Sequence, residues 1–328
     1  MGDAIHALPA AASLKCSYPE ARLTWAIEPR WAPLLEGNPF VDRVAPVRRK
    51  SARGLIESWR ELRAERYELA VDFQGLLKSA LTAAAARPGR IFGFESTRER
   101  AAAVFYSDRI PVLAAHIVDR NLELAQAAGA STLRHEFPLP QGTPEGDLPE
   151  GDFVLASPLA GWRAKQWPAE NYARLARMLD REFGIPLVAN GPPGLAFAAL
   201  PGCRAHHSGI AGLIHATRRA AAVVGVDSGP LHLAAALGKP GVAIFGPTDP
   251  ARNGPYGGSM AVLRAADAVT TYKRGIEIDE SMRSISPEEV FEALKGALHG
   301  GTDGTVHAAQ RTRLGTASSV PGSEAKRG

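Results

Sequence analysis

The sequence predicts an α/β fold of the doubly wound class, with parallel sheets divided between two halves of the chain. Short, nearly continuous apolar runs alternate with segments of helical length, the pattern of buried parallel strands joined by helices. The segment Pro138–Gly151 interrupts this alternation with prolines and glycines, which is typical of a connection between domains. The length of 328 residues is sufficient for two such domains.

Each element is expected from its local hydrophobic pattern. The first half begins with a helix whose first turn holds Asp3. Apolar runs then predict strands at 23–27, 43–47 and 69–73, and helical periodicity predicts helices at 54–66 and 76–86. In the second half the same patterns predict strands at 153–156, 186–189, 221–226 and 242–245, and helices at 169–183, 209–218 and 230–237.

The end of the chain divides into a helix and a tail. Ser286, Pro287, Glu288 and Glu289 form a helix start, with a capping serine, a proline in the first turn and acids that complement the helix dipole. Residues 301–328 lack hydrophobic periodicity and are predicted to be disordered.

The composition excludes several classes of protein. A hydrophobic fraction of 45% and a charged fraction of 22% rule out collagen-like, coiled-coil and wholly disordered chains. Two cysteines are too few for a disulfide framework or for a four-cysteine zinc site. The net charge of +4 is too small for a nucleic-acid-binding domain. No apolar run is long enough to span a membrane, and Asp3 stands where a signal peptide needs basic residues, so we expect a cytoplasmic protein.

Several catalytic motifs are missing from the sequence. No G-x-G-x-x-G follows a strand, and neither a phosphate-binding G-x-x-x-x-G-K-[ST] loop nor a G-x-S-x-G elbow occurs. The sequence also lacks a well-spaced group of His, Cys and Asp, so no metal site is expected.

Polar residues follow three predicted strands of the second half, where doubly wound folds bind ligands. Asp227 and Ser228 precede a helix start, and the free backbone N–H groups of a helix start favour an anionic ligand. The two residues also fit the role of a simple helix cap. A cap alone does not explain His232, which lies one turn later. The turn at Gly246–Pro250 offers Thr248 to a phosphate or sugar hydroxyl, and it also fits an ordinary loop. Lys165 can reach a pyrophosphate as a point charge, or lie solvated.

The first half offers two further candidates. Asp3 fits the role of a general base. Taken alone, its position in the first turn of a helix is better explained as a carboxylate that complements the helix dipole. The cluster Arg48, Arg49, Lys50 and Arg53 fits an anionic ligand or a solvated face near an anionic bilayer.

Five of these stretches together resemble glycosyltransferase family 9, and within it the lipopolysaccharide heptosyltransferases. They occur in the family's order and cover residues 1–298. They are Met1-Gly2-Asp3 with Pro9, Asp72 to Ser79, Lys165-Gln166-Trp167-Pro168, Asp227 to His232, and Gly246 to Pro250. Two further pieces look most like heptosyltransferase I, namely Thr97-Arg98-Glu99 with Phe105-Tyr106, and His116 to Arg120.

The resemblance implies a GT-B fold, in which two Rossmann-like domains face a cleft. Residues 1–145 are then the acceptor-binding domain and residues 146–300 the domain that binds the nucleotide sugar. In the family a strand precedes the Met-Gly-Asp motif, so we expect the first domain to lack its first strand. The implied activity is inverting, metal-independent transfer of heptose from ADP-L-glycero-D-manno-heptose to a Kdo sugar of lipid A. It needs no cofactor and takes place at the cytoplasmic face of the inner membrane.

The resemblance also implies residue roles. Asp3 takes the proton of the acceptor hydroxyl. Donor contacts fall to Lys165, Asp227, Ser228, Gly229, His232, Gly246 and Thr248. Acceptor contacts fall to His6, Arg48, Arg49, Lys50, Lys78, Arg98, His116 and Arg120.

Two alternatives remain open at the level of sequence. The family usually carries an acidic residue for the nucleotide ribose after a glycine-rich turn, whereas the corresponding stretch 190–196 contains none. A relative that uses another donor or acceptor therefore stays in consideration. So does a truncated, non-catalytic relative that binds glycolipid.

Overall fold

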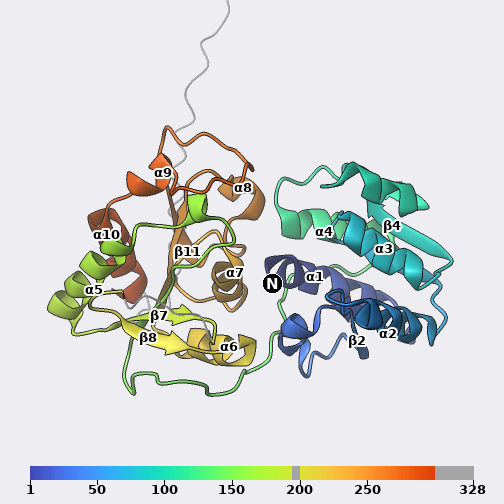
Figure 1. Ribbon diagram of the computed structural model, residues 1–328, viewed down its shortest axis with the longest axis horizontal. Helices are drawn as coiled ribbons and strands as arrows, with labels where there is room; N and C mark the ends of the chain where they lie inside the picture. Colours follow the sequence, from blue (N-terminus) through green and yellow to red (C-terminus); the bar gives the residue numbers. More distant parts are fainter. Residues whose placement is uncertain (194–199, 300–328) are drawn as a thin grey trace, which may run out of the picture.

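The computed structural model describes residues 1–193 and 200–299; the tail expected at 301–328 lies outside the described residues. The described chain forms two α/β halves that stand side by side (Figure 1). Every strand pairing between the described residues is parallel, which confirms the predicted fold class.

The second half is built on a six-stranded sheet. Its order is β8 (Arg204–His207), β7 (Leu187–Gly191), β6 (Val154–Ser157), β9 (Ala222–Val226), β10 (Gly241–Phe245) and β11 (Met260–Arg264). Numbered along this half, the strand order is 3-2-1-4-5-6, that of a doubly wound nucleotide-binding sheet. The winding direction reverses between β6 and β9, and ligands in such sheets bind beyond the carboxyl ends of the strands at that point.

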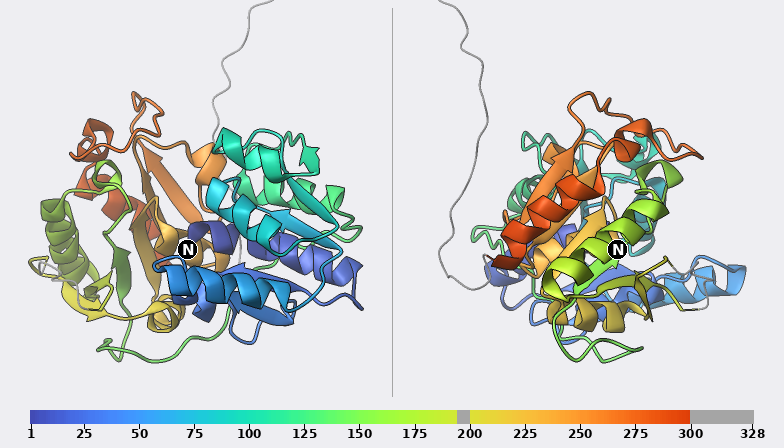
Figure 2. Two further views of the ribbon diagram at one scale, coloured as in Figure 1. Left: turned by 45° about the vertical axis from the view of Figure 1, so that its right-hand side comes forward. Right: turned by 90° about the vertical axis from the view of Figure 1, so that its left-hand side faces the viewer.

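Helices cover both faces of this sheet (Figures 1 and 2). α5 (Ala169–Phe183) and α10 (Pro287–His299) pack on one face. α6 (Ile210–Arg219) and α7 (Gly229–Ala236) pack on the face that meets the first half. Three short helices stand in the loops: η3 (Arg163–Lys165), α8 (Pro250–Asn253) and α9 (Glu280–Arg283). The predicted helix start at Ser286 is confirmed, because Ser286 and Glu289 bond reciprocally as a capping box.

The first half divides its strands between two sheets. β1 (Thr24–Ile27) pairs with β2 (Arg43–Pro46), while β3 (Leu69–Asp72), β4 (Arg90–Phe94) and β5 (Asp108–Ile110) form a separate sheet. The helices of this half are α1 (Gly2–Ser17), η1 (Pro29–Leu35), α2 (Ala52–Arg63), α3 (Leu77–Ala85), η2 (Arg100–Phe105) and α4 (Ile117–Ala127).

Helix α1 joins the cores of the two halves. Its residues from Ile5 to Leu14 are all buried, and it packs against α4 of its own half and α7 of the other. Ile5 and Leu8 belong to the same apolar cluster as Leu231 and Leu233 of α7. The side chains at the start of α1 are therefore held at the boundary between the halves.

The predicted connection at residues 138–151 has no regular secondary structure, as expected. It is nevertheless held against the second half. The Arg218 guanidinium of α6 donates to the carbonyls of Leu139 and Pro140, each at 2.9 Å. Gly142 has a φ of +73°, and a Cβ there would collide with the Ala211 carbonyl oxygen, so this stretch packs closely on α6.

Candidate functional site

Three charged or polar side chains of the second half meet at the carboxyl end of β9. The Lys165 ammonium lies 3.0 Å from one carboxylate oxygen of Asp227, and His232 Nε2 lies 3.4 Å from the other. Lys165 reaches this point from the end of η3, and His232 from the first turn of α7. Asp227 is buried by this arrangement, so the solvated-lysine and simple-cap interpretations of these residues do not describe the structure.

The charge state of Asp227 follows from these two neighbours. Burial alone raises the pKa of a carboxyl group. Here His232 and Lys165 outweigh burial and hold the pKa of Asp227 well below its ordinary value. The carboxylate is therefore ionised at neutral pH and fixes the Lys165 ammonium beside the helix start of α7.

Buried hydroxyl groups without a protein partner stand at the ends of the strand that precedes Asp227 and of its two neighbours in the sheet. They belong to Ser157, Ser228 and Thr248, which stand at or just beyond the carboxyl ends of β6, β9 and β10. Ser228 precedes α7 but its side chain makes no capping hydrogen bond. Because buried polar atoms are nearly always bonded, three unsatisfied hydroxyls at adjacent strand ends indicate a site for a polar ligand.

Ser157 is the member of this group that the sequence analysis did not select as a site residue. The signal that identified Asp227 and Thr248, a polar residue at the end of an apolar strand, also applies to Ser157.

Two glycines of the candidate donor set have close neighbours that exclude a side chain. A Cβ at Gly229 would lie 2.8 Å from Met1 Cβ, and one at Gly246 would lie 2.7 Å from side-chain atoms of Met282 and Ser281. The turn at Gly246 is further held by Arg264, whose Nε donates to the Gly246 carbonyl at 3.1 Å. These glycines permit the backbone to pass close by and so place the neighbouring amides.

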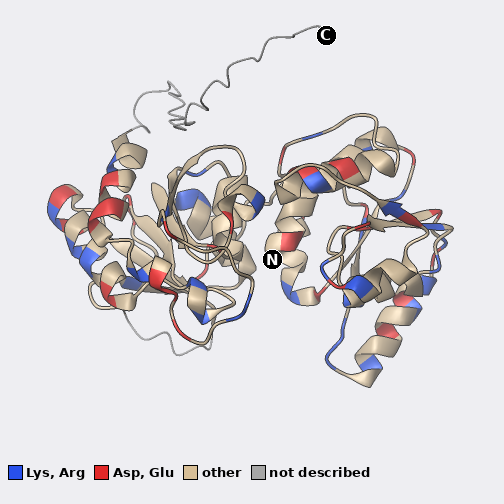
Figure 3. Ribbon diagram, turned by 90° about the horizontal axis from the view of Figure 1, so that it is seen from above, with Lys and Arg blue, Asp and Glu red and all other residues tan. Residues whose placement is uncertain are grey.

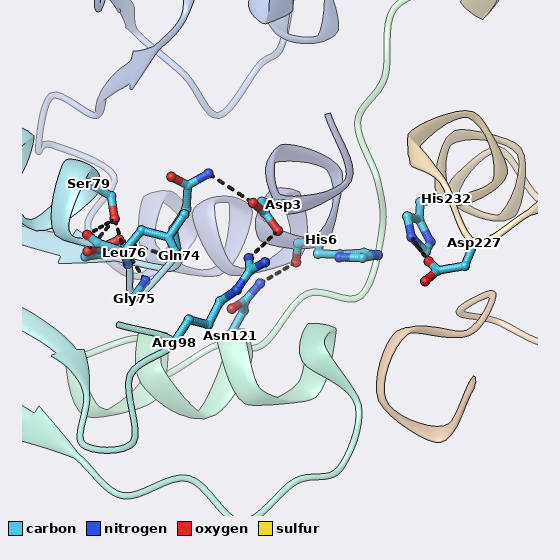
Figure 4. A network of polar contacts seen from close by, with 11 residues as sticks. Asp3, His6, Gln74, Gly75, Leu76, Ser79, Arg98, Asn121, Asp227 and His232 are labelled. Carbon is cyan, nitrogen blue, oxygen red and sulfur yellow. Dashed lines mark hydrogen bonds and ion pairs between the residues drawn. The ribbon is translucent and has the colours of Figure 1, made fainter. Parts of the chain in front are cut away.

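Asp3 lies in the first turn of α1, half-exposed at the edge of the first half (Figure 4). Gln74 Nε2 donates to Asp3 Oδ2 at 3.2 Å, and Arg98 Nη1 donates to Asp3 Oδ1 at 3.2 Å. The preceding residue, Gly2, faces the other half, since a Cβ on it would lie 3.0 Å from His232 Cδ2. Asp3 is thus an accessible carboxylate oriented by Gln74 and Arg98, and His6 of the same helix lies between it and His232 (Figure 4).

A buried network fixes the loop that carries Gln74 (Figure 4). Asp72 Oδ1 accepts from the backbone N–H of Gln74 at 2.9 Å. Asp72 Oδ2 accepts from the Ser79 hydroxyl at 2.8 Å and from the Tyr106 hydroxyl at 2.6 Å. Burial and the Asp72 carboxylate raise the pKa of Tyr106 well above its usual value, so its hydroxyl stays a donor. Asp72 is therefore a structural carboxylate that positions Gln74, and through Gln74 the carboxylate of Asp3.

Three histidines gather where the halves meet. The His6 ring of α1 packs edge-on against His232 of α7, with centroids 4.3 Å apart, and lies 6.2 Å from His116 of α4. Burial, followed by the neighbouring His232 and His116, lowers the pKa of His6 well below its ordinary value. Burial also lowers the pKa of His116, whose Nε2 lies 3.1 Å from the Gly254 carbonyl oxygen of the second half. Both rings are therefore neutral contacts between the halves at pH 7.

This burial predicts a pH dependence of stability. The pKa of His6 is lower in the folded than in the unfolded chain, so the unfolded chain takes up the proton first as the pH falls. The contribution of His6 is complete above about pH 6.5 and is lost below it, with a slope of up to about 1.4 kcal/mol per pH unit. Urea unfolding between pH 7.5 and 5.5 should show this slope, and His6→Asn should flatten it. The change His215→Asn on α6 serves as the control, and an unchanged slope in His6→Asn would refute the assignment.

Most of the other candidate acceptor residues lie near the starts of α2 and α3. Arg49 pairs with Glu28 at 2.7 Å and approaches the Lys78 carbonyl oxygen at 3.4 Å, which brings the starts of α2 and α3 together. Arg48, Lys50 and Lys78 are exposed near these helix starts. Arg120 of α4 lies apart from them, against the Phe94 ring and the Ala114 carbonyl.

Within residues 1–193 and 200–299, no group of three or more His, Cys, Asp or Glu side chains is placed to hold a metal ion. Over the same part of the chain, none of the helices has the length and apolarity needed to cross a bilayer. The stretch 190–196, which lacks the ribose-binding acid, is described only as far as Pro193.

Comparison with known proteins agrees with this architecture. Residues 55–277 match the model of glycosyltransferase family 9 (heptosyltransferase). Lipopolysaccharide heptosyltransferase 1 of Pseudomonas aeruginosa is 32% identical over 298 residues, covering 80% of this chain and 81% of the relative. The solved structure of E. coli heptosyltransferase WaaC with ADP superposes with a TM-score of 0.71 at 24% identity, over 90% of this chain and 96% of that one. The same enzyme with ADP-2-deoxy-2-fluoro heptose gives a TM-score of 0.69 over the same shares, also at 24% identity.

The fold and these similarities define the chain as a glycosyltransferase with the two-domain GT-B architecture. It belongs to glycosyltransferase family 9, the heptosyltransferase family.

Proposed function

We propose that this enzyme transfers heptose from ADP-L-glycero-D-manno-heptose to a Kdo sugar of the lipid A inner core, with inversion and without a metal ion. The relatives of known name support the sugar and the pathway, since the one at 32% identity is a lipopolysaccharide heptosyltransferase 1. The two similar solved structures support the donor, since one holds ADP and the other holds ADP-2-deoxy-2-fluoro heptose.

One observation of the chain carries the proposal. The accessible carboxylate of Asp3 comes from the first half and the Lys165–Asp227–His232 group from the second, and both stand at the boundary where the start of α1 approaches His232. A base and a cationic leaving-group site on opposite sides of a domain boundary are what an inverting transfer requires, because nucleophile and leaving group occupy opposite faces of the sugar.

The reaction can be written in one step. The acceptor hydroxyl oxygen attacks the anomeric carbon and forms the new glycosidic bond, while Asp3 accepts the hydroxyl proton. The bond between the anomeric carbon and the pyrophosphate oxygen breaks, and its electron pair leaves with ADP. Lys165 and the free amides at the start of α7 stabilise the negative charge on the departing pyrophosphate.

The remaining residues are assigned to the two substrates. Asp227, His232 and the hydroxyls of Ser157, Ser228 and Thr248 supply hydrogen bonds for the donor sugar and its phosphates. Arg98, with the cations at the starts of α2 and α3, supplies positive charge for the carboxylate and phosphates of the acceptor. His6 and His116 line the boundary beside Asp3, and Arg120 extends the cationic side toward α4. The acceptor is a lipid, so we place the enzyme at the cytoplasmic face of the inner membrane.

Incubation of the chain with ADP-L-glycero-D-manno-heptose and Kdo₂-lipid A tests the proposal. We expect ADP release that requires the acceptor, continues in the presence of EDTA, and yields a lipid heavier by one heptose in mass spectrometry. Thermal shift with ADP, UDP and GDP tests the nucleotide independently, because a ligand that binds only the folded state raises the melting temperature. No transfer, or stabilisation by UDP or GDP in place of ADP, contradicts the proposal.

A further inference from the structure

Two neighbouring helices of the first half expose large apolar side chains to solvent. On α2, Leu55 and Ile56 are each 50% exposed and Trp59 is 46% exposed. On α3, Leu77 is 37% and Leu81 is 48% exposed. These five are among the thirteen large hydrophobic side chains that are exposed in the described part of the chain. We call this set the α2–α3 surface.

The two helices run side by side in the same direction and are tied at both ends. Near their starts Arg49 approaches the Lys78 carbonyl, and at their ends Arg63 Nε donates to the Ala85 carbonyl at 3.1 Å. Gly54, Ser58 and Leu62 of α2 face the interior. At about 3.6 residues per turn, Leu55 and Trp59 flank this buried face and Ile56 lies farther round the helix. The apolar face of α2 is therefore wider than the part that packs on the interior, and the described part of the chain leaves Leu55, Ile56 and Trp59 half-exposed.

Positive charge borders this apolar surface. Basic and acidic residues are interspersed over both halves of the molecule (Figure 3), but residues 48–66 hold seven Lys or Arg and three Glu, a net charge of +4 that equals that of the whole chain. All three acids are already engaged: Glu57 pairs with Arg53, Glu61 with Arg43, and Glu65 with Arg22 and Arg43. Arg63 stacks on the outer indole, 3.7 Å above the Trp59 ring.

We propose that the α2–α3 surface docks on an anionic lipid bilayer. Leucine, isoleucine and tryptophan flanked by arginine are the composition of helices that lie in the plane of a membrane interface, where the apolar side chains enter the acyl boundary and the guanidinium groups meet phosphates. A nucleic acid does not fit the apolar stripe, and a purely apolar protein partner does not fit the excess of arginine. The occupant that matches both features is a membrane that carries negative headgroups.

The surface also lies where a lipid-bound substrate is needed. α3 directly follows the loop that carries Gln74, which bonds to Asp3. Docking through α2 and α3 therefore brings Asp3 close to the bilayer surface. In this respect the inference deepens the proposed function, although bilayer binding itself does not depend on which sugar is transferred.

Vesicle co-sedimentation of the full chain tests this inference, using phosphatidylcholine vesicles with and without 30% phosphatidylglycerol and no acceptor lipid. We expect binding to the anionic vesicles that weakens with salt, and little binding to phosphatidylcholine alone. Leu55→Gln with Ile56→Gln should weaken vesicle binding about tenfold, because two partly exposed apolar side chains no longer enter the membrane. Arg53→Gln with Arg60→Gln should remove the preference for anionic vesicles.

Matched controls keep the result interpretable. Leu113 and Ile276 are 94% and 82% exposed and lie outside the surface, so Leu113→Gln with Ile276→Gln should bind vesicles like the wild type, and Arg181→Gln on α5 should do the same. Circular dichroism and melting temperature confirm that each variant folds. If the two apolar double variants weaken vesicle binding equally, the docking surface is refuted. It is also refuted if light scattering shows a dimer that dissociates only in the variant Leu55→Gln with Ile56→Gln, because the surface then binds a second copy of the chain. Transfer to a deacylated, water-soluble acceptor separates the proposed heptosyl transfer from the proposed bilayer docking, because it tests the chemistry without the bilayer.

Discussion

Asp3→Asn is expected to lower the transfer rate about 10²–10⁴-fold, the range that a positioned general base contributes. Asparagine keeps the size of the side chain, and its carbonyl oxygen can still accept from Gln74 or Arg98, but it cannot take the hydroxyl proton. The loss should fall on kcat, while the affinity for ADP, measured by calorimetry, should stay within about twofold because the proposed donor contacts all lie on the second half.

The control for this prediction is a carboxylate that serves no proposed role. Asp267 is exposed on the loop after β11, and Asp267→Asn should transfer heptose at the wild-type rate. Gln74→Ala should give an intermediate loss, since it removes one of the two side chains that orient Asp3. A variant Asp3→Asn that retains full kcat would remove Asp3 from the mechanism and would direct attention to the neighbouring His6.

The elements that the sequence predicted best are those whose burial is set by their own composition. Helix α5 has the predicted bounds Ala169–Phe183, and the central strands β6, β9 and β10 are fully buried apolar runs found within a residue or two of their predicted positions. A strand that is buried on both faces must be apolar throughout, so its signal is local.

The sequence analysis missed β4, β5, β8 and β11, of which β5 has only three residues and β8 is polar. β5, β8 and β11 lie at the edges of their sheets, and β8 reads Arg-Ala-His-His. β4 contains Gly93, where a Cβ would collide with the Tyr106 ring. For β5 and β8, pairing with a neighbouring strand makes the segment a strand, and a local pattern does not contain that information. β4 and β11 do contain apolar runs, which the sequence analysis did not assign.

In the candidate site, too, some features were predictable from the local sequence and others were not. Residues at strand ends were predictable because the topology of a parallel sheet places all carboxyl ends at one edge. The partners of Asp3 were not, since Gln74 and Arg98 lie 71 and 95 residues away in the sequence. The pairing of Lys165 with Asp227 spans 62 residues and makes Lys165, for which a solvated position was the alternative to ligand binding, half of a buried ion pair. Such contacts depend on the packing of whole elements.

Asp227→Asn is expected to destabilise the folded enzyme by about 3–5 kcal/mol, because it leaves the Lys165 ammonium buried without its counter-charge. Both side chains are largely inaccessible, with exposures of 14% for Lys165 and 7% for Asp227. The effect should persist across neutral pH. The pKa of Asp227 is depressed in the folded state, so its contribution is complete above the ordinary aspartate range and is lost only as the pH falls through the lower folded value.

Urea unfolding of a double-mutant cycle separates the pair from its surroundings. Lys165→Met removes the cation, so Lys165→Met with Asp227→Asn should be more stable than the sum of the single losses predicts, and the difference measures the coupling. The exposed pair Arg98–Asp3, with side-chain exposures of 50% and 41%, provides the contrast: Arg98→Met should cost less than about 1 kcal/mol. If Asp227→Asn cost no more than Arg98→Met, the carboxylate would not be holding Lys165 in a buried pair. The placement of that lysine for the leaving pyrophosphate would then need another cause, so this cycle tests the donor side of the mechanism without any substrate.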